Sequence, residues 1–249
     1  SLRNRLVDTH RVEMAMLDIR FLRKAAEQDD ARAQYSLGVM FYKGKGVPQD
    51  YPEAAKWFRK AAEQGLALAQ FNLGLMSSQG QGVPQDSAEA AKWYRKAAEQ
   101  GYATAQFNLG VMFDTGEGVP QDSAEAAKWY RKAAEQGLAT AQFSLGLMFH
   151  EGQGVPRNYP EAAKWFRKAA EQGEAQAQFN LGVMSHAGQG VPQDYVQSYF
   201  WFSLEASRSS GEDHRKYSDA RDRAAIKLTP DKLVEAQRMI REWEKSHPR

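Results

Sequence analysis

The chain has 249 residues, of which 42% are hydrophobic and 26% charged, and its formal net charge is +2. A charge this close to zero argues against nucleic acid as the default partner, because binding to phosphates needs a basic surface. Cysteine is absent, which excludes disulfides, thiolate catalysis and Cys-ligated zinc. No apolar run reaches the roughly 18 residues of a membrane-spanning helix, so we expect a soluble protein without such a segment.

Internal repetition dominates the sequence. A tryptophan recurs every 36 residues, and so do one proline and a pair of glycines. The recurring tryptophans are Trp57, Trp93, Trp129, Trp165 and Trp201. Five near-identical units therefore cover residues 30–209. A period of this length is typical of a solenoid, in which each unit packs only against its neighbours.

A capping region is expected before the first unit, over residues 1–29. The segment Glu13–Gln28 has apolar residues at helical spacing, and Phe21 stands 36 residues before Trp57. We therefore expect a helix in the place of a tryptophan-bearing helix. Residues 1–12 show little pattern and are compatible with a further helix or a frayed end.

Each unit contains an amphipathic helix, of which Tyr51–Gln64 is an example. Alanines, Trp57 and a phenylalanine share one arc of this helix, and charged residues fill the opposite side. The pair Asp50 and Glu53 resembles a capping box, in which Asp50 accepts from an early N–H and Glu53 reaches back. Gly65 provides a left-handed stop at the other end.

The other helix of each unit, for which residues 66–79 are an example, carries two apolar faces. Leu73 and Met76 belong to one face and Phe71 to the other, so we expect contacts with the partner helix and with a neighbouring unit. Gly74 has an equivalent in every unit. Because glycine costs about 1 kcal/mol relative to alanine in a helix interior, we expect it to allow a second backbone to approach closely.

A second capping region is expected over residues 210–249, where the repeat decays. Residues 212–227 and 229–245 predict two helices, and Thr229-Pro230-Asp231 is a favourable start for the second one. Charged residues near its end, among them Arg241 and Glu244, predict the polar outer face that a terminal cap needs.

The repeated blocks resemble the Sel-1-like repeat (SLR) family, a relative of the tetratricopeptide repeat. The blocks are Ala-Ala-Lys-Trp-(Tyr/Phe)-Arg-Lys-Ala-Ala-Glu-Gln-Gly, Ala-Gln-Phe-(Asn/Ser)-Leu-Gly-(Val/Leu)-Met and Gly-x-Gly-Val-Pro-Gln-Asp, within residues 25–208. The resemblance implies an all-α, right-handed superhelix of helix pairs whose concave groove binds a partner protein or peptide. It also implies a bacterial adaptor or scaffold. The compartment stays open between the cytoplasm and, if a signal peptide was trimmed, the periplasm or the outside of the cell. The disulfides of the cysteine-rich branch are missing here.

Motifs that would indicate chemistry are weak. Lys45 lies between two glycines but lacks the spacing of a phosphate-binding loop, and His150-Glu151 lacks the second histidine of a zinc protease. The sequence predicts no cofactor, no metal site and no catalytic residue. An enzyme acting on β-lactams or peptidoglycan, as claimed for some cysteine-rich relatives, stays an alternative, although no Ser-x-x-Lys occurs. RNA binding, known for other helical repeats, is a third hypothesis.

Differences between the near-identical units indicate a candidate binding strip. Because neighbouring helices lie about 8–10 Å apart, the row that contains Asp114, His150 and His186 is too wide for one metal ion. By likeness to tetratricopeptide arrays, the variable positions face the concave groove, where polar side chains would hold a partner. Neutral drift at exposed sites is the alternative. The candidate residues are Arg32, Tyr42, Lys43, Asn72, Gln79, Asn108, Asp114, Thr115, His150, Glu151, Asn180 and His186.

Overall fold

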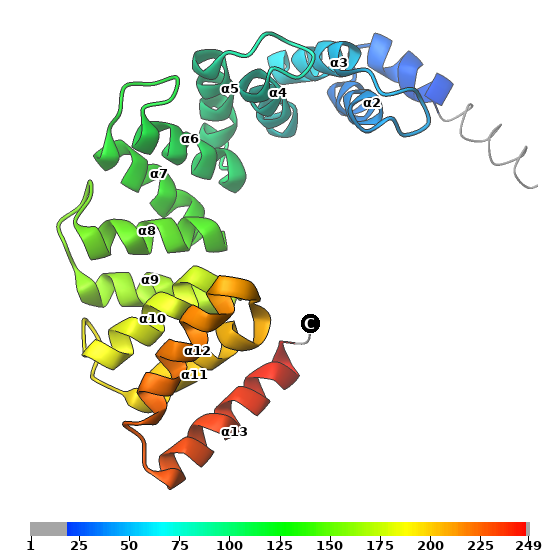
Figure 1. The fold of residues 1–249 in the computed structure, drawn as a ribbon. Helices are drawn as coiled ribbons and strands as arrows, with labels where there is room; N and C mark the ends of the chain where they lie inside the picture. Colours follow the sequence, from blue (N-terminus) through cyan, green and yellow to red (C-terminus); the bar gives the residue numbers. More distant parts are fainter. Residues whose placement is uncertain (1–18, 248–249) are drawn as a thin grey trace, which may run out of the picture. The chain divides into compact units, whose positions relative to one another are not determined.

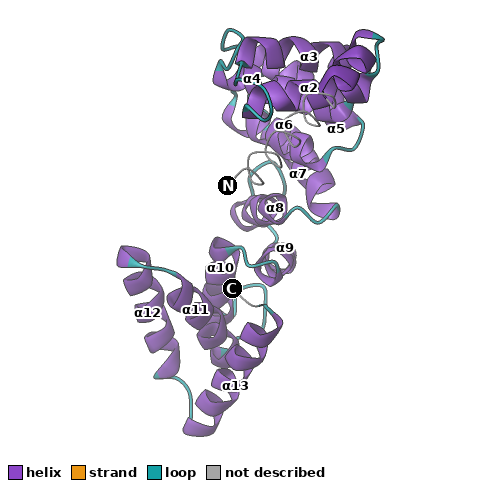
Figure 2. Ribbon diagram, turned by 90° about the vertical axis from the view of Figure 1, so that its right-hand side faces the viewer, coloured by secondary structure: helices purple, strands orange, loops and turns teal. Residues whose placement is uncertain are grey.

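The computed structural model describes residues 19–247, and within them the protein is built from helices, turns and loops without a strand (Figures 1 and 2). The expectations for residues 1–18 lie outside the described residues. Residues 19–27 are helical. The helices that follow are α2 (Ala31–Lys43), α3 (Tyr51–Glu63), α4 (Ala67–Gln79), α5 (Ser87–Glu99), α6 (Ala103–Thr115), α7 (Ser123–Glu135), α8 (Ala139–Glu151), α9 (Tyr159–Glu171), α10 (Ala175–Ala187), α11 (Tyr195–Arg208), α12 (Gly211–Ala225) and α13 (Pro230–Ser246).

The helices alternate between two types within two compact units, Ser1–Asp122 and Ser123–Arg249. We call α2, α4, α6, α8 and α10 the A helices, and α3, α5, α7, α9 and α11 the B helices. In the first unit, α2 packs against α3, α3 against α4, α4 against α5, and α5 against α6. In the second unit, the same holds from α7 to α12, and α13 packs on α11. The expected stack of helix pairs is confirmed in each unit.

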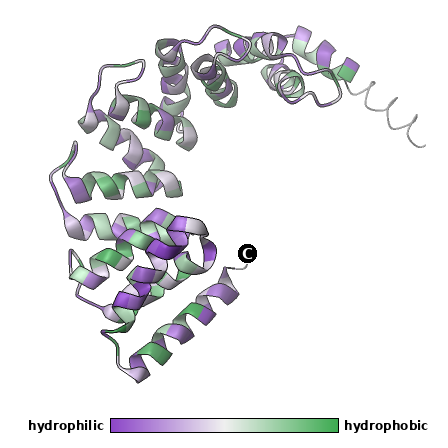
Figure 3. Ribbon diagram, in the orientation of Figure 1, coloured by the Kyte–Doolittle hydropathy of each residue, from purple (hydrophilic) through white to green (hydrophobic). Residues whose placement is uncertain are grey.

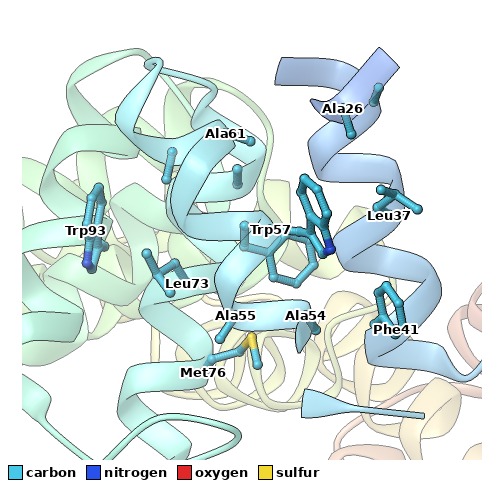
Figure 4. Close-up of a cluster of buried hydrophobic side chains, with 14 residues drawn as sticks. Ala26, Leu37, Phe41, Ala54, Ala55, Trp57, Ala61, Leu73, Met76 and Trp93 are labelled. Atoms are coloured by element: carbon cyan, nitrogen blue, oxygen red, sulfur yellow. The ribbon is translucent and has the colours of Figure 1, made fainter. Parts of the chain in front are cut away.

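The B helices bury the face that carries their tryptophan. Trp57 is 7% exposed and projects from α3 toward α2, next to Leu37 (Figure 4). The alanines around it on α3 are also buried, whereas Lys56 and Lys60 are exposed. This arrangement confirms the amphipathic pattern, and the equivalent tryptophans are buried to a similar extent. At about 25 cal/mol per Å², one such side chain contributes roughly 4–6 kcal/mol before entropy is subtracted.

The start of each B helix is held by only half of the expected capping box. The Oδ1 atom of Asp50 accepts from the N–H of Glu53 at 2.9 Å, as predicted. The prediction of the reciprocal bond from the N–H of Asp50 to Glu53 is wrong, because this N–H donates instead to the carbonyl of Phe41 on the A helix, at 3.0 Å. The glutamate is thereby left for its own helix, and Glu89, the equivalent in α5, accepts from the indole N–H of Trp93 at 2.9 Å.

The glycine inside each A helix makes room for an aromatic ring. Gly146 of α8 lies against Phe166 of α9, where a Cβ would stand 2.6 Å from two ring carbons. Phe166 is fully buried, so its ring has no free space to move into. The expected close approach is therefore present, but a ring fills the space here and not a second backbone.

A buried glutamine near the start of each A helix donates to a carbonyl at the end of the preceding helix, and in α2, α4 and α8 it also accepts from the end of the following B helix. In the first unit, Nε2 of Gln70 donates to the carbonyl of Ala62 in α3 at 3.0 Å. Its Oε1 accepts from Gln100, at the end of α5, at 2.7 Å. The donor bond recurs with the same eight-residue spacing at Gln34, Gln106, Gln142 and Gln178. Each glutamine thus adds a second hydrogen bond to a carbonyl at the end of the preceding helix, which also accepts from a backbone N–H three residues later.

The loop after each A helix returns to the preceding pair. Gly82, with φ of +70°, follows α4 and lies against Tyr51 at the start of α3. A Cβ at this glycine would collide with the backbone carbonyl of Tyr51. Val83 beside it packs partly buried against the core of the first unit, as expected for the loop valine.

The C-terminal helices extend the repeat further than the sequence suggests. His214 of α12 stands 36 residues after Gln178, and its Nδ1 lies 2.7 Å from the carbonyl of Ala206. This contact has the same eight-residue spacing as the glutamine bonds, so α12 occupies the place of a further A helix. Most of α12 is hydrophilic, as a terminal element requires (Figure 3). The helix α13 closes on α11 through Trp243, whose ring lies 5.7 Å from that of Trp201.

A carboxyl group is buried where the repeat ends. Glu205 of α11 is 3% exposed, at a position where the other units have a fully buried alanine, such as Ala169. Burial raises the pKa of Glu205 above its ordinary value; Arg208 lowers this pKa and Glu174 raises it. Ionisation of Glu205 therefore destabilises the folded state.

We predict that Gly146→Ala destabilises the second unit by about 1–3 kcal/mol through overpacking against Phe166. Helix propensity alone predicts the opposite sign, a gain of roughly 1 kcal/mol. Urea unfolding monitored by circular dichroism measures the change. In a double-mutant cycle, Gly146→Ala combined with Phe166→Leu should cost less than the two single losses together, because the collision needs the ring. An unchanged or higher unfolding midpoint for Gly146→Ala would contradict the account.

We predict that Glu205→Ala raises the melting temperature at pH 8, by roughly 2–4 °C for each kcal/mol gained. Because the pKa of Glu205 is raised in the folded state, protonation of this side chain favours folding. This stabilisation is complete below the unfolded pKa and is lost as the pH rises through the folded pKa. The gain from the substitution should therefore shrink toward pH 4. Glu171→Ala, at an exposed position in α9, is the control and should show no such trend. A gain that is independent of pH would refute the role of the charge.

Candidate functional site

The candidate site is the variable strip of the A helices. It comprises three positions on each A helix, and all of them lie at the surface or near it. The outer positions are mostly exposed and the middle position is half-buried in every A helix. In the first unit the strip is Arg32, Ser36 and Lys43; Leu68, Asn72 and Gln79; Thr104, Asn108 and Thr115. In the second unit it is Thr140, Ser144 and Glu151; Gln176, Asn180 and Ala187.

Middle positions of the strip interact with neighbouring helices in the first unit. The amide of Asn72 donates to the hydroxyl of Tyr35 in α2, at 3.4 Å. Asn108 and Ser78 interact with the hydroxyl of Tyr94, which reaches them from α5. Burial raises the pKa of Tyr94, and the hydrogen bonds from Ser78 and Asn108 act in the opposite direction. These asparagines therefore help to hold adjacent helices together, and the exposed outer positions are the ones open to a partner.

The row Tyr42, Ser78, Asp114, His150 and His186 lies one position before the end of the strip and is half-buried. Its aromatic members pack against the first residue of the following B helix. The ring of Tyr42 lies 5.3 Å from that of Tyr51, His150 lies 5.3 Å from Tyr159, and His186 lies 5.1 Å from Tyr195. Packing between the two helices of one unit thus accounts for much of the surface of these side chains.

The glutamine after each loop proline has a role that the sequence analysis missed. Nε2 of Gln49 donates to the carbonyl of Tyr42 at 2.9 Å, and Gln193 donates to the carbonyl of His186 at 2.9 Å. Arg157 replaces the glutamine in one unit and donates to the carbonyl of Glu151 at 3.1 Å. The signal was present in the repeat, because this position is always a long side chain with N–H donors.

Within residues 19–247, no group of three or more His, Asp or Glu side chains is placed to hold a metal ion. His150 and His186 each contact a tyrosine of their own unit, as described above. No helix in this part of the chain is both long and apolar enough to cross a membrane.

The exposed face of the B helices contrasts with the strip. Its charges are paired within their own helix: Lys92 lies 3.3 Å from Glu89, and Nζ of Lys96 lies 4.1 Å from the ring centre of Trp93. The same lysines recur unchanged in α3, α5, α7 and α9. This face repeats one composition, whereas the strip changes from helix to helix.

A cavity that sequence analysis did not anticipate lies between α10, α11 and α12. Its volume is about 260 Å³. The residues that line it are Phe179, Val183, His186 and Ala187 of α10, Phe202 of α11, and Ala220 and Arg223 of α12. The sequence analysis missed it because the residues of α12 no longer match the repeat, although the helix keeps its 36-residue register. The 36-residue step from Gln178 to His214 is the signal that could have revealed it.

Comparison with known proteins agrees with this architecture. The model of the Sel1 repeat matches residues 19–30, 31–66, 67–102, 103–138, 139–174 and 175–208. The crystal structure of c5321, a protective antigen present in uropathogenic Escherichia coli strains and displaying an SLR fold, is 40% identical with a TM-score of 0.79. The alignment covers 92% of this chain and 49% of that chain, so the protein spans about half the length of this relative.

A Sel1 repeat protein from Oxalobacter formigenes is 34% identical with a TM-score of 0.72, and the alignment covers 86% of both chains. The comparison with curated proteins finds no match. The matched repeats extend over most of the chain, and their boundaries coincide with the helix pairs of the structure. The protein therefore belongs to the Sel1 repeat family.

Proposed function

We propose that the protein is a non-enzymatic scaffold that binds a partner protein or peptide through the variable strip of its A helices. Proteins of the Sel1 repeat family are generally helical scaffolds for protein interactions. The coarser role follows from membership of the family. The finer role, in which the strip holds the partner, rests on a comparison of the strip with the exposed face of the B helices.

The main support is a comparison of two exposed surfaces in one chain. On the B helices, Lys56 and Lys60 are exposed, and their equivalents in α5, α7 and α9 are exposed lysines as well. On the A helices, the outer strip positions are Arg32, Leu68, Thr104, Thr140 and Gln176 at one end, and Lys43, Gln79, Thr115, Glu151 and Ala187 at the other. The two lysines are unchanged from α3 to α9, although another exposed position of the same helices (Pro52, Ala88, Ala124 and Pro160) varies. Both outer positions of the strip vary along the A helices, and this variation at two positions per helix favours selection for a partner.

The chemistry of the strip fits a polypeptide partner. Its outer positions carry amides, hydroxyls and single charges of both signs, which can bond to a main chain and select side chains. The half-buried asparagines support the helices that carry these groups. We assign the binding itself to the exposed outer positions and a supporting role to Asn72 and Asn108.

We predict that a photo-crosslinking amino acid at Leu68 or Gln79 captures one defined partner from cells of the source organism. The same group at Lys56 or Lys92, on the B helices, is the matched control and should capture that partner at least about tenfold less efficiently, because crosslinking requires contact. Immunoblotting and mass spectrometry of the adducts give the measurement. Equal crosslinking from both faces, or capture from the B helices alone, would refute the strip as the binding surface.

Substitution of the outer positions gives an independent test. The triple variant Arg32→Ala, Gln79→Ala and Thr115→Ala should weaken the captured complex by about tenfold or more, equivalent to roughly 1.4 kcal/mol. Its melting temperature should stay unchanged, since these side chains are exposed. Lys56→Ala combined with Lys92→Ala should leave binding intact. Full affinity in the strip variant would sink the proposal.

A further inference from the structure

The groove between α10 and α12 leaves apolar surface accessible on α10, the last of the A helices. Val183 is 41% exposed, whereas the equivalent Val39, Leu75, Val111 and Leu147 are half-buried. Phe179 and Phe202 form further apolar walls of the same 260 Å³ cavity, and their ring centres lie 5.5 Å apart. A side chain that enters here would remove both its own surface and that of Val183 from water.

One wall of the groove is positively charged. Lys216, Ala220 and Arg223 follow a helical spacing of four and three residues, which places them on one face of α12. Nζ of Lys216 lies 4.4 Å from the ring centre of Phe179, and Arg223 lines the cavity. Both cations are exposed, and neither forms an ion pair within residues 19–247.

The acidic residues of α12 form no ion pair with these two cations within residues 19–247, and Glu212 and Asp213, one turn before Lys216, are exposed. Asp222 is paired with Arg221 at 2.7 Å. Asp219 is exposed, does not line the cavity and forms no ion pair with Lys216 or Arg223. Arg223 lines the cavity and Lys216 lies over the ring of Phe179, so an anion beside the groove gains from both charges at once.

The size of the cavity indicates what can enter. Small-molecule sites commonly measure about 300–1,000 Å³ and enclose most of their ligand. The groove is below that range, so it suits one side chain of a longer segment better than a complete small molecule.

We propose that the groove between α10 and α12 anchors an acidic segment of the partner protein through one apolar side chain. The apolar side chain lies on Phe179, Val183 and Phe202, and carboxylates before or after it pair with Lys216 and Arg223. This inference rests on the proposed function, since it names the chemistry of the partner where the strip meets α12.

Fluorescence polarisation with the full chain and short labelled peptides tests the proposal. The main probe is a peptide of eight glutamates around one central leucine. Two matched probes replace the leucine by alanine or all glutamates by glutamine. We expect the main probe to bind at least about tenfold more tightly than either matched probe, and to weaken as salt increases. Equal binding of the main probe and either matched probe, or no binding of the main probe at millimolar concentration, would overturn the proposal.

Variants of α12 and α10 locate the site. Lys216→Glu combined with Arg223→Glu should weaken the main probe by about tenfold or more. Arg215→Glu reverses one charge, as each of these two substitutions does, at an exposed position that does not line the groove, and it should stay within about twofold of the native protein. Val183→Asp should also weaken binding. Thermal melting followed by circular dichroism verifies that each variant is folded. If the double glutamate variant unfolds, Lys216→Gln combined with Arg223→Gln replaces it, and we expect a smaller loss of affinity for the main probe. An equal effect of Arg215→Glu would refute the site.

The outcome is separable from that of the proposed function. The triple strip variant lies in the first unit and should bind the peptides normally. If the peptides fail to bind while crosslinking from Leu68 and Gln79 persists, only the anchoring groove is refuted. If crosslinking fails while the peptide still needs Lys216 and Arg223, the groove stands and the strip is refuted.

Discussion

The buried glutamine at the start of each A helix is the interaction on which the stacking of the repeats depends. Gln70, for example, donates a second hydrogen bond to the carbonyl of Ala62 at the end of α3 and accepts one from Gln100 at the end of α5, so three helices meet at one amide. A buried amide left without these partners would cost about 1–3 kcal/mol, which makes any other register of the helices unfavourable. Where the repeat ends, Oε1 of Gln178 has no partner within the described residues, because Arg208 stands where earlier units have a glutamine.

Much of the fold could be predicted because its determinants are local and repeated. The period of 36 residues, the amphipathic B helices and the aspartate caps each follow from residues close together in the chain, as Trp57 and Asp50 illustrate. The reciprocal half of the capping box could not be predicted in this way. Its outcome depends on the carbonyl of Phe41, which the loop brings to the N–H of Asp50 from the preceding helix. The ring on Gly146 likewise comes from another helix.

The site was predictable only as a set of positions. The variable strip lies at the surface, as its variation suggests, but the sequence does not distinguish Asn72, which bonds to Tyr35, from Gln79, which is exposed. That distinction depends on contacts between successive pairs of helices. The groove beside α12 was beyond the sequence analysis for another reason. There the register persists after the residues of the repeat have been replaced, so the pattern that identifies the earlier units is missing.

The loop glycine that touches the preceding pair restricts how such a protein can change in length. Because Gly82 fits against the carbonyl of Tyr51 without room for a side chain, the loop has a fixed position along the helix beneath it. A deletion or insertion of a few residues would move every later contact out of phase. Removal or duplication of one complete 36-residue module preserves all of them. Unequal recombination between identical modules is therefore the route by which this architecture can gain or lose binding surface while it keeps its core.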